Sequence, residues 1–133
     1  MSARIEGHAE EILKGKNFAH VGTLRADGSV QVAPVWVDVQ DGLPVVNTAE
    51  GRAWPSNLER DPRITLEVQN MENPYEYAEI RGRVAERTHE GADEHIDSLA
   101  KKYLGQDEYP YRQPGERRLI IRVEPEYVKV MGG

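Results

Sequence analysis

Hydrophobic and polar residues alternate along several segments of the chain, which is the pattern of a strand with one buried face. The clearest example is 77–88, where Ala78-Glu-Ile-Arg-Gly-Arg-Val-Ala85 places apolar and charged residues in turn. The same criteria predict five more strands, at 18–25, 29–39, 43–48, 64–69 and 118–131, the last interrupted near Pro125. The pairs Asp27-Gly28 and Asp41-Gly42 favour tight hairpin turns, because both residue types tolerate a positive φ.

Helices are predicted where apolar residues recur at a spacing of three or four. The segments 6–14 and 91–104 have this pattern, and a short helix is expected to start near Pro55 and end before Pro62. Six strands joined mainly by hairpins, with a few helices, indicate a mainly β protein built as an antiparallel barrel or strongly curved sheet. Alternating βαβ units are missing, which argues against a Rossmann fold.

The composition is that of a single globular domain, which we expect to span 1–133. Of the 133 residues, 38% are hydrophobic and 30% are charged, and no apolar run is long enough to span a bilayer. The chain has no cysteine, and its first residues lack the apolar core of a signal peptide, so we expect a cytoplasmic protein. The net charge of −6 argues against non-specific binding to nucleic acid, but local arginines can still bind a small anion.

The most informative segment is 47–63, which joins two expected strands. Within it, Asn47-Thr-Ala-Glu-Gly-Arg52 offers small residues, a hydroxyl and an arginine directly before a helix start. Exposed backbone amides at a helix start, together with an arginine, form a site for an anion such as a cofactor phosphate. In the alternative interpretation the segment only connects two strands, and Arg52 pairs with Glu59 or Asp61.

Trp36 lies inside the expected strand 29–39 and also has two interpretations. It can fill the core or a subunit interface, or Pro34-Val35-Trp36 can line the edge of a flat aromatic ligand. Pro34 agrees with the second interpretation, because a proline inside a strand lacks the donor that a neighbouring strand would need.

No local motif assigns a catalytic residue or a metal site. The two nearest of the four histidines, His89 and His95, are six residues apart across a helix start and do not share a helix face. The chain also lacks a Gly-x-Ser-x-Gly elbow and the phosphate-loop and dinucleotide fingerprints. This pattern agrees with chemistry that a bound cofactor supplies.

Six segments, spread between about Ile5 and Val130, match the motifs of one enzyme family in order and spacing. They are Phe18-Ala-His-Val-Gly-Thr-Leu-Arg-Ala-Asp-Gly-Ser29, Gln31-Val-Ala-Pro-Val-Trp36, Val46-Asn-Thr-Ala-Glu-Gly-Arg52, Asn57-Leu-Glu-Arg-Asp-Pro-Arg-Ile-Thr65, Asn73-Pro-Tyr-Glu-Tyr-Ala-Glu-Ile-Arg-Gly-Arg-Val84 and His95-Ile-Asp-Ser-Leu-Ala-Lys-Lys-Tyr-Leu-Gly105. In them the chain resembles the flavin- and deazaflavin-dependent reductases of the split β-barrel superfamily, also called pyridoxamine 5′-phosphate oxidase-like. It is most similar to the branch that uses the deazaflavin coenzyme F420. The resemblance implies a six-stranded antiparallel split β-barrel of the FMN-binding type.

The resemblance also implies a homodimer with a cofactor site at the subunit interface. The implied contacts are Gln31, Pro34, Val35 and Trp36 along the ring system, Asn47, Thr48 and Ala49 near the ribityl-phosphate, and Arg52 and Asn57 in the phosphate pocket. A loop with the partner subunit's Tyr77 is expected to close the site. The implied reaction is hydride transfer between F420 and a small unsaturated organic substrate. The protein is expected to orient the cofactor and to exclude competing reactions.

The chain departs from the family at one place. The family pattern after Arg52 runs Arg-x-Lys-x-Arg-Asn-Leu, but Trp54 stands here in place of the lysine and Ser56 in place of the second arginine. The indole N–H of Trp54 can donate only a neutral hydrogen bond to a phosphate, where lysine would supply a charge. Two alternatives therefore stay open: an FMN-dependent oxidoreductase, or a non-catalytic ligand-binding protein with a degraded phosphate pocket. Substrate specificity is expected to lie in the loops 71–77 and 106–115.

Overall fold

The computed structural model describes residues 3–132, so the expected domain limits of 1–133 extend past it at both ends. The elements within these residues are α1 (Gly7–Lys14), β1 (Ala19–Leu24), β2 (Val30–Val35), β3 (Val37–Gln40), β4 (Leu43–Ala49), α2 (Ala53–Arg60), β5 (Arg63–Gln69), β6 (Tyr77–Thr88), α3 (Ala92–Leu104) and β7 (Arg118–Met131). Among the helices between residues 3 and 132, none combines the length and the apolar character needed to cross a bilayer.

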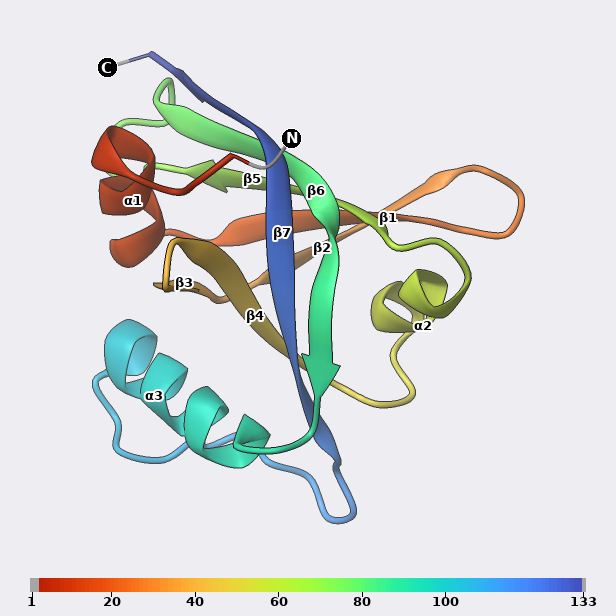
Figure 1. Ribbon diagram of the computed structural model, residues 1–133. Coiled ribbons are helices and arrows are strands. Elements are labelled where there is room, and N and C mark those ends of the chain that lie inside the picture. The colour runs from red at the N-terminus through yellow and green to blue at the C-terminus, as the bar shows by residue number, and fades with distance from the viewer. Residues whose placement is uncertain (1–2, 133) are drawn as a thin grey trace.

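The seven strands form a single sheet in the order β2-β1-β5-β6-β7-β4-β3, and all neighbours are antiparallel. The sheet curls around on itself (Figure 1). Nearly every strand contributes fully buried side chains to the core. Their alternation along the strands is regular in β5, where Ile64, Leu66 and Val68 point inward and the residues between them are partly exposed. This arrangement confirms the predicted mainly β, antiparallel split barrel.

The predicted strand 29–39 is in fact two strands, which raises the number of strands from six to seven. β2 pairs with β1 at one edge of the sheet, whereas β3 pairs with β4 at the opposite edge. Only Trp36 separates them. We call this crossing from one sheet edge to the other the seam. The hydrophobic pattern runs through the seam without interruption, so it could not reveal that the chain changes its hydrogen-bonding partner there.

Side chains of α3 satisfy the backbone at the seam. The Tyr103 hydroxyl accepts a hydrogen bond from the Val37 amide at 3.2 Å and donates one to the Asn17 carbonyl at 2.7 Å. The Lys102 ammonium donates to the carbonyl of Val37 at 2.6 Å and to that of Leu13 at 2.8 Å. These contacts matter because a buried backbone group without a partner costs about 1–3 kcal/mol.

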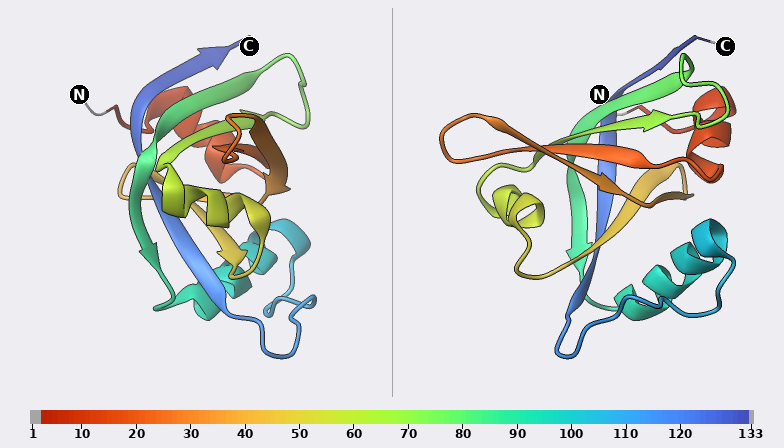
Figure 2. Two further views of the ribbon diagram at one scale, coloured as in Figure 1. Left: turned by 90° about the vertical axis from the view of Figure 1, so that its right-hand side faces the viewer. Right: turned by 180° about the vertical axis from the view of Figure 1, so that it is seen from behind.

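The short helix expected near Pro55 is α2, which begins at Ala53 and places Pro55 in its first turn, where a missing N–H does no harm. One further expectation needs correction. β7 continues through Pro125 without interruption, because a register shift between Arg81 and Gly82 of β6 accommodates the proline. In space, α1 and α2 lie near opposite ends of the curled sheet, and α3 lies beside β4 and β7 (Figure 2).

The register shift yields a test of the fold at Gly82. A Cβ at this position would lie 2.1 Å from the carbonyl oxygen of Glu124, a backbone atom that cannot swing away. We expect Gly82→Ala to lower the free energy of unfolding by about 2 kcal/mol or more. In the matched control Gly22→Ala, the new methyl group meets Val30 at an ordinary 3.5 Å, and a much smaller change is expected. Urea denaturation of both variants measures the difference, and equal midpoints would contradict the packing described at the register shift.

Candidate functional site

A cavity of about 240 Å³ opens beside the seam. It lies where β2, β4, the start of α2, α3 and the segment between α3 and β7 meet. Its lining residues are Phe18, Pro34, Val35, Trp36, Asn47, Arg52, Ile96, Tyr109, Tyr111 and Arg118. The lining combines aromatic surfaces with two guanidinium groups, which suits a flat ligand that carries negative charge.

The aromatic part of the cavity is built on Trp36. Its indole stacks on the ring of Tyr103, with centroids 5.2 Å apart and planes 6° apart. Tyr109 meets the same indole edge-on at 5.9 Å, and Tyr111 in turn meets Tyr109 edge-on at 5.7 Å. Because Tyr103 also binds the seam backbone, the Trp36 ring is held in one place.

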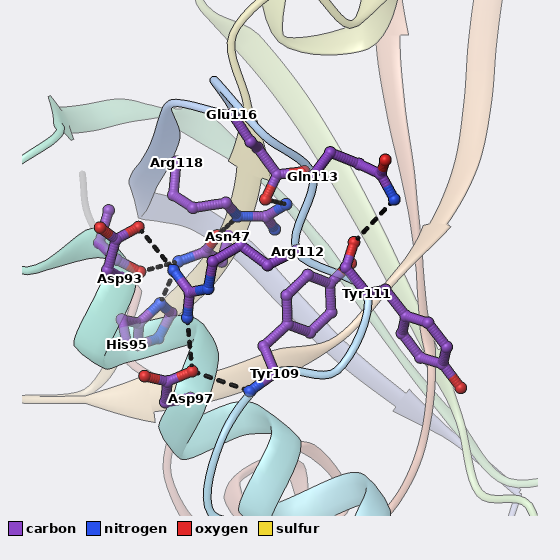
Figure 3. A network of polar contacts seen from close by, with 11 residues as sticks. Asn47, Asp93, His95, Asp97, Tyr109, Tyr111, Arg112, Gln113, Glu116 and Arg118 are labelled. Atoms are coloured by element: carbon purple, nitrogen blue, oxygen red, sulfur yellow. Dashed lines mark hydrogen bonds and ion pairs between the residues drawn. The ribbon is translucent and has the colours of Figure 1, made fainter.

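The polar part is a buried network centred on Asn47 (Figure 3). The Asn47 amide nitrogen donates to the Ala92 carbonyl and to Nδ1 of His95, both at 3.0 Å, and its oxygen accepts from Nε of Arg118 at 2.8 Å. A histidine Nδ1 that accepts a hydrogen bond carries its proton on Nε2. Burial lowers the pKa of His95 to about 4, so the ring is neutral near pH 7.

In the described part of the chain, Arg118 keeps unused hydrogen-bonding capacity within this network, as does the buried Nε2 of His95. Only 4% of the residue is exposed, and burial, the larger influence, lowers the pKa of its guanidinium while Glu116 opposes the shift. Nη1 of Arg118 lies 3.2 Å from Oε1 of Glu116, which is an ion-pair distance. Yet the two atoms are not aligned for a hydrogen bond, and neither has a hydrogen-bond partner among residues 3–132. The pair is therefore attractive but leaves donor capacity unused.

A loop closes over this network. The Tyr109 amide donates to Oδ1 of Asp97 at 2.8 Å, and Arg112 joins Asp97 at 2.7 Å and Asp93 at 3.2 Å (Figure 3). These contacts attach the segment between α3 and β7 to α3. They place the ring of Tyr109 over the Arg118 guanidinium, 5.1 Å from its carbon.

Five of the residues expected to contact a cofactor lie together in the cavity wall, namely Pro34, Val35, Trp36, Asn47 and Arg52. The alternative in which Arg52 pairs with Glu59 or Asp61 is wrong. Asp61 instead binds Arg63 at 2.8 Å, and Glu59 lies 3.5 Å from Arg87.

The other expected contacts do not line the cavity. Thr48 and Ala49 are buried in β4, and Oγ1 of Thr48 has no hydrogen-bond partner in the described part of the chain. Asn57 donates to Oε1 of Gln31 at 3.0 Å and to Thr23 at 3.1 Å, so these polar groups satisfy one another. Tyr77 starts β6, and the expected contact is made by the partner subunit's Tyr77, so this expectation stays a prediction.

Trp54 lies in the hydrophobic core with only 4% of its surface exposed. The expectation that its indole contacts a phosphate in this cavity is therefore not met by the geometry. The first turn of α2 turns this position inward, whereas Arg52, just before the helix, faces the cavity.

Arg118, which supplies the second guanidinium of the cavity, was not predicted from the sequence as a site residue. From sequence, Arg118 is predicted only to be the polar first residue of a strand. Its pairing opposite Ala49 is what brings it beside Asn47. Tyr109 and Tyr111 do belong to the segment 106–115 that was expected to govern specificity, and they line the cavity.

Two other surface cavities are less suited to an anion that carries a ring. One, of about 360 Å³, lies between α1 and the β5–β6 loop and includes the carboxylates of Glu11, Glu72 and Glu76. The other, of about 370 Å³, contains Arg63 and Arg81, but Arg63 is bound to Asp61 and no aromatic side chain lines it.

The fold and the seam cavity together define a split-barrel protein with an aromatic, arginine-bearing cavity as its candidate ligand site. The chain belongs to the pyridoxamine 5′-phosphate oxidase family, whose model matches residues 5–132. A search of curated proteins found no match.

Many solved structures resemble the chain. An F420 reductase is 26% identical, with a TM-score of 0.80 over 93% of this chain and 97% of the reductase. A conserved hypothetical protein from Mycobacterium tuberculosis is 18% identical, with a TM-score of 0.72 over 96% of this chain and 86% of its own. General stress protein 26 from Bacillus anthracis is 17% identical, with a TM-score of 0.65 over 91% and 88%. The last two likenesses concern the fold alone.

The neutral His95 predicts a pH dependence of stability. Its folded pKa of about 4 lies below the ordinary value of 6.5, so the unfolded chain binds the proton more readily. The stability that His95 contributes is complete above about pH 6.5 and is lost as pH falls from 6.5 toward 4, by up to about 3 kcal/mol.

The variant His95→Asn, which keeps an acceptor for Asn47, isolates this effect. The difference in unfolding free energy between the two proteins should be constant above pH 6.5 and should shrink toward pH 4. Carboxylates titrate in both proteins and cancel in the difference. Parallel curves from pH 7 to pH 4 would show that His95 is not held neutral by the fold.

Proposed function

We propose that this protein is an oxidoreductase that binds the deazaflavin coenzyme F420 in the seam cavity and transfers a hydride between it and a small unsaturated organic substrate. The observation that carries the proposal is the meeting of Trp36, Asn47 and Arg52 at one cavity, from three separate segments. The similarity to an F420 reductase supports the choice of cofactor.

Each part of the cavity has a role in this proposal. The bound deazaflavin supplies the hydride, so no protein nucleophile is required. The rigid Trp36 wall orients the ring system, and Arg52 attracts the phosphate. Tyr109 and Tyr111 shield the reacting face from water.

We further propose that a second copy of the chain completes the site. A cavity of about 240 Å³ is smaller than the roughly 300–1,000 Å³ that encloses a drug-sized ligand, so one chain covers only part of the cofactor. The edge strand β2, which borders the cavity, exposes 58% of Val30 and 62% of Val32. Exposed β-branched residues on a sheet edge are a contact surface for another chain.

Sedimentation equilibrium tests the homodimer, with Val32→Lys as the disrupting variant. We expect the unmodified protein to be a dimer at micromolar concentration, and Val32→Lys to shift it toward monomer with an unchanged fold. A monomeric unmodified protein would contradict the dimer but not the cavity.

Two other functions remain as alternatives. The same cavity chemistry suits FMN, which also joins a flat ring system to a phosphate. Because Trp54 is turned into the core, the lysine of the family pattern has no counterpart at this position, which favours a weaker or non-catalytic site.

A fluorescence titration with oxidised and reduced F420, and with FMN, separates these functions. We expect saturable F420 binding below about 50 μM. Arg52→Gln should weaken it about tenfold or more through the loss of a charge-assisted contact, and the exposed control Arg117→Gln should not. Preferential FMN binding, or a flavin that copurifies, would favour the FMN enzyme. If neither cofactor binds at tens of micromolar, the proposed reaction is wrong.

A further inference from the structure

Two guanidinium groups line the seam cavity, but only Arg52 comes from the segment where the family pattern places its basic residues. The second, Arg118, comes from the start of β7, where it pairs with Ala49 of β4. Its side chain is buried, whereas long cationic side chains in proteins are mostly exposed. A buried cation needs a specific reason, because removal of its charge from water is costly.

The contacts of Arg118 fix the position of its guanidinium but leave one of its nitrogens without a hydrogen-bond acceptor among the described residues. Asn47 accepts from Nε at 2.8 Å, and Asn47 is itself held by His95 and the Ala92 carbonyl. The guanidinium therefore has a fixed orientation. Its Nη1 is buried and has no hydrogen-bond partner within residues 3–132, although Glu116 lies at an ion-pair distance.

The surroundings favour an anion at this unused edge. Arg52 lines the same cavity and is among the charges that lower the pKa of Arg118, so the two cations repel each other. Within residues 3–132, the acidic partner of Arg118 is Glu116, which offsets only one of the two positive charges. Tyr109 covers the guanidinium at 5.1 Å and shields it from solvent, which strengthens electrostatic attraction.

We propose that Arg118, positioned by Asn47, binds an oxyanion of the ligand in the seam cavity together with Arg52. Arginine suits this role because its planar fork matches the geometry of phosphate and carboxylate groups. The oxyanion can come from the cofactor phosphate or from a carboxylate of the substrate. In the first case, β7 supplies a charge that α2 lacks, since Trp54 and Ser56 replace the basic residues of the family pattern.

This inference rests on the proposed cofactor site, but its first test does not depend on F420. The Nε–H signal of Arg118 in a ¹H–¹⁵N spectrum, assigned with Arg118→Gln, reports directly on the guanidinium. Titration with inorganic phosphate and, separately, with benzoate should shift this signal saturably at millimolar concentrations. A shift with phosphate points to the cofactor, and a shift with benzoate alone points to a substrate carboxylate. If neither anion moves the signal up to about 20 mM, the proposal is overturned, whether or not F420 binds.

The second test compares FMN with riboflavin, two ligands that differ only in the phosphate. For a cofactor phosphate, FMN should bind more tightly than riboflavin. Arg118→Gln should reduce this preference about tenfold or more without weakening the phosphate-free ligand. Glu116→Gln should increase the preference, because the competing carboxylate is gone. Arg117→Gln, an exposed neighbour with the same charge, should change neither.

A purely structural role for Arg118 gives a different result. Arg118→Gln would then weaken the binding of FMN and of riboflavin equally. Glu116→Gln would likewise weaken binding and would not increase the preference for FMN. This result would overturn the proposal. Thermal unfolding of each variant checks that it folds. If Arg118→Gln does not fold, Arg118→Lys replaces it, since it retains the charge but not the planar fork. Arg118→Lys should still lower the phosphate preference, and an unchanged preference would also overturn the proposal.

Discussion

The hydrogen bonds between α3 and the backbone at the seam hold together both the barrel and its cavity. At Trp36 the chain leaves one edge of the sheet and joins the other, and the Val37 amide and carbonyl lie at the start of the new strand. Tyr103 and Lys102 bind these groups from α3. The ring of Tyr103 also stacks on Trp36. The residue that binds the backbone at the seam therefore also positions the aromatic wall of the cavity.

The polar half of the cavity depends on a similar double use of side chains. Asn47 joins β4 to α3 through the Ala92 carbonyl and His95, and it orients Arg118 of β7. Three elements that are distant in sequence thus meet at one amide. Because the ring of His95 is neutral near pH 7, it adds no charge beside the guanidinium. The net charge of the cavity is therefore set by the two cations Arg52 and Arg118, whose positive charge Glu116 partly offsets.

Much of the fold could be predicted from sequence, because alternation and Asp-Gly turns act locally. The break at Trp36 could not, since it depends on which strand each half of the segment pairs with. In the candidate site, Pro34, Trp36 and Arg52 were singled out both by local chemistry, a proline inside a strand and an arginine before a helix start, and by motif resemblance, and they do share a cavity. Arg118 was missed because its place beside Asn47 comes from the register of β4 and β7. Trp54 was assigned to the wrong environment, because a pattern of letters does not show which way the first turn of a helix faces.

We propose that the seam cavity holds a flat, anionic cofactor, with its rings along Trp36 and its phosphate at the two arginines. A crystal structure of the protein with F420 would show whether the cofactor lies there. We expect density for the deazaflavin rings along Trp36 and Pro34, with phosphate oxygens within hydrogen-bond distance of Arg52 and Arg118. Clear density for the cofactor elsewhere, or a phosphate that contacts neither arginine, would contradict it.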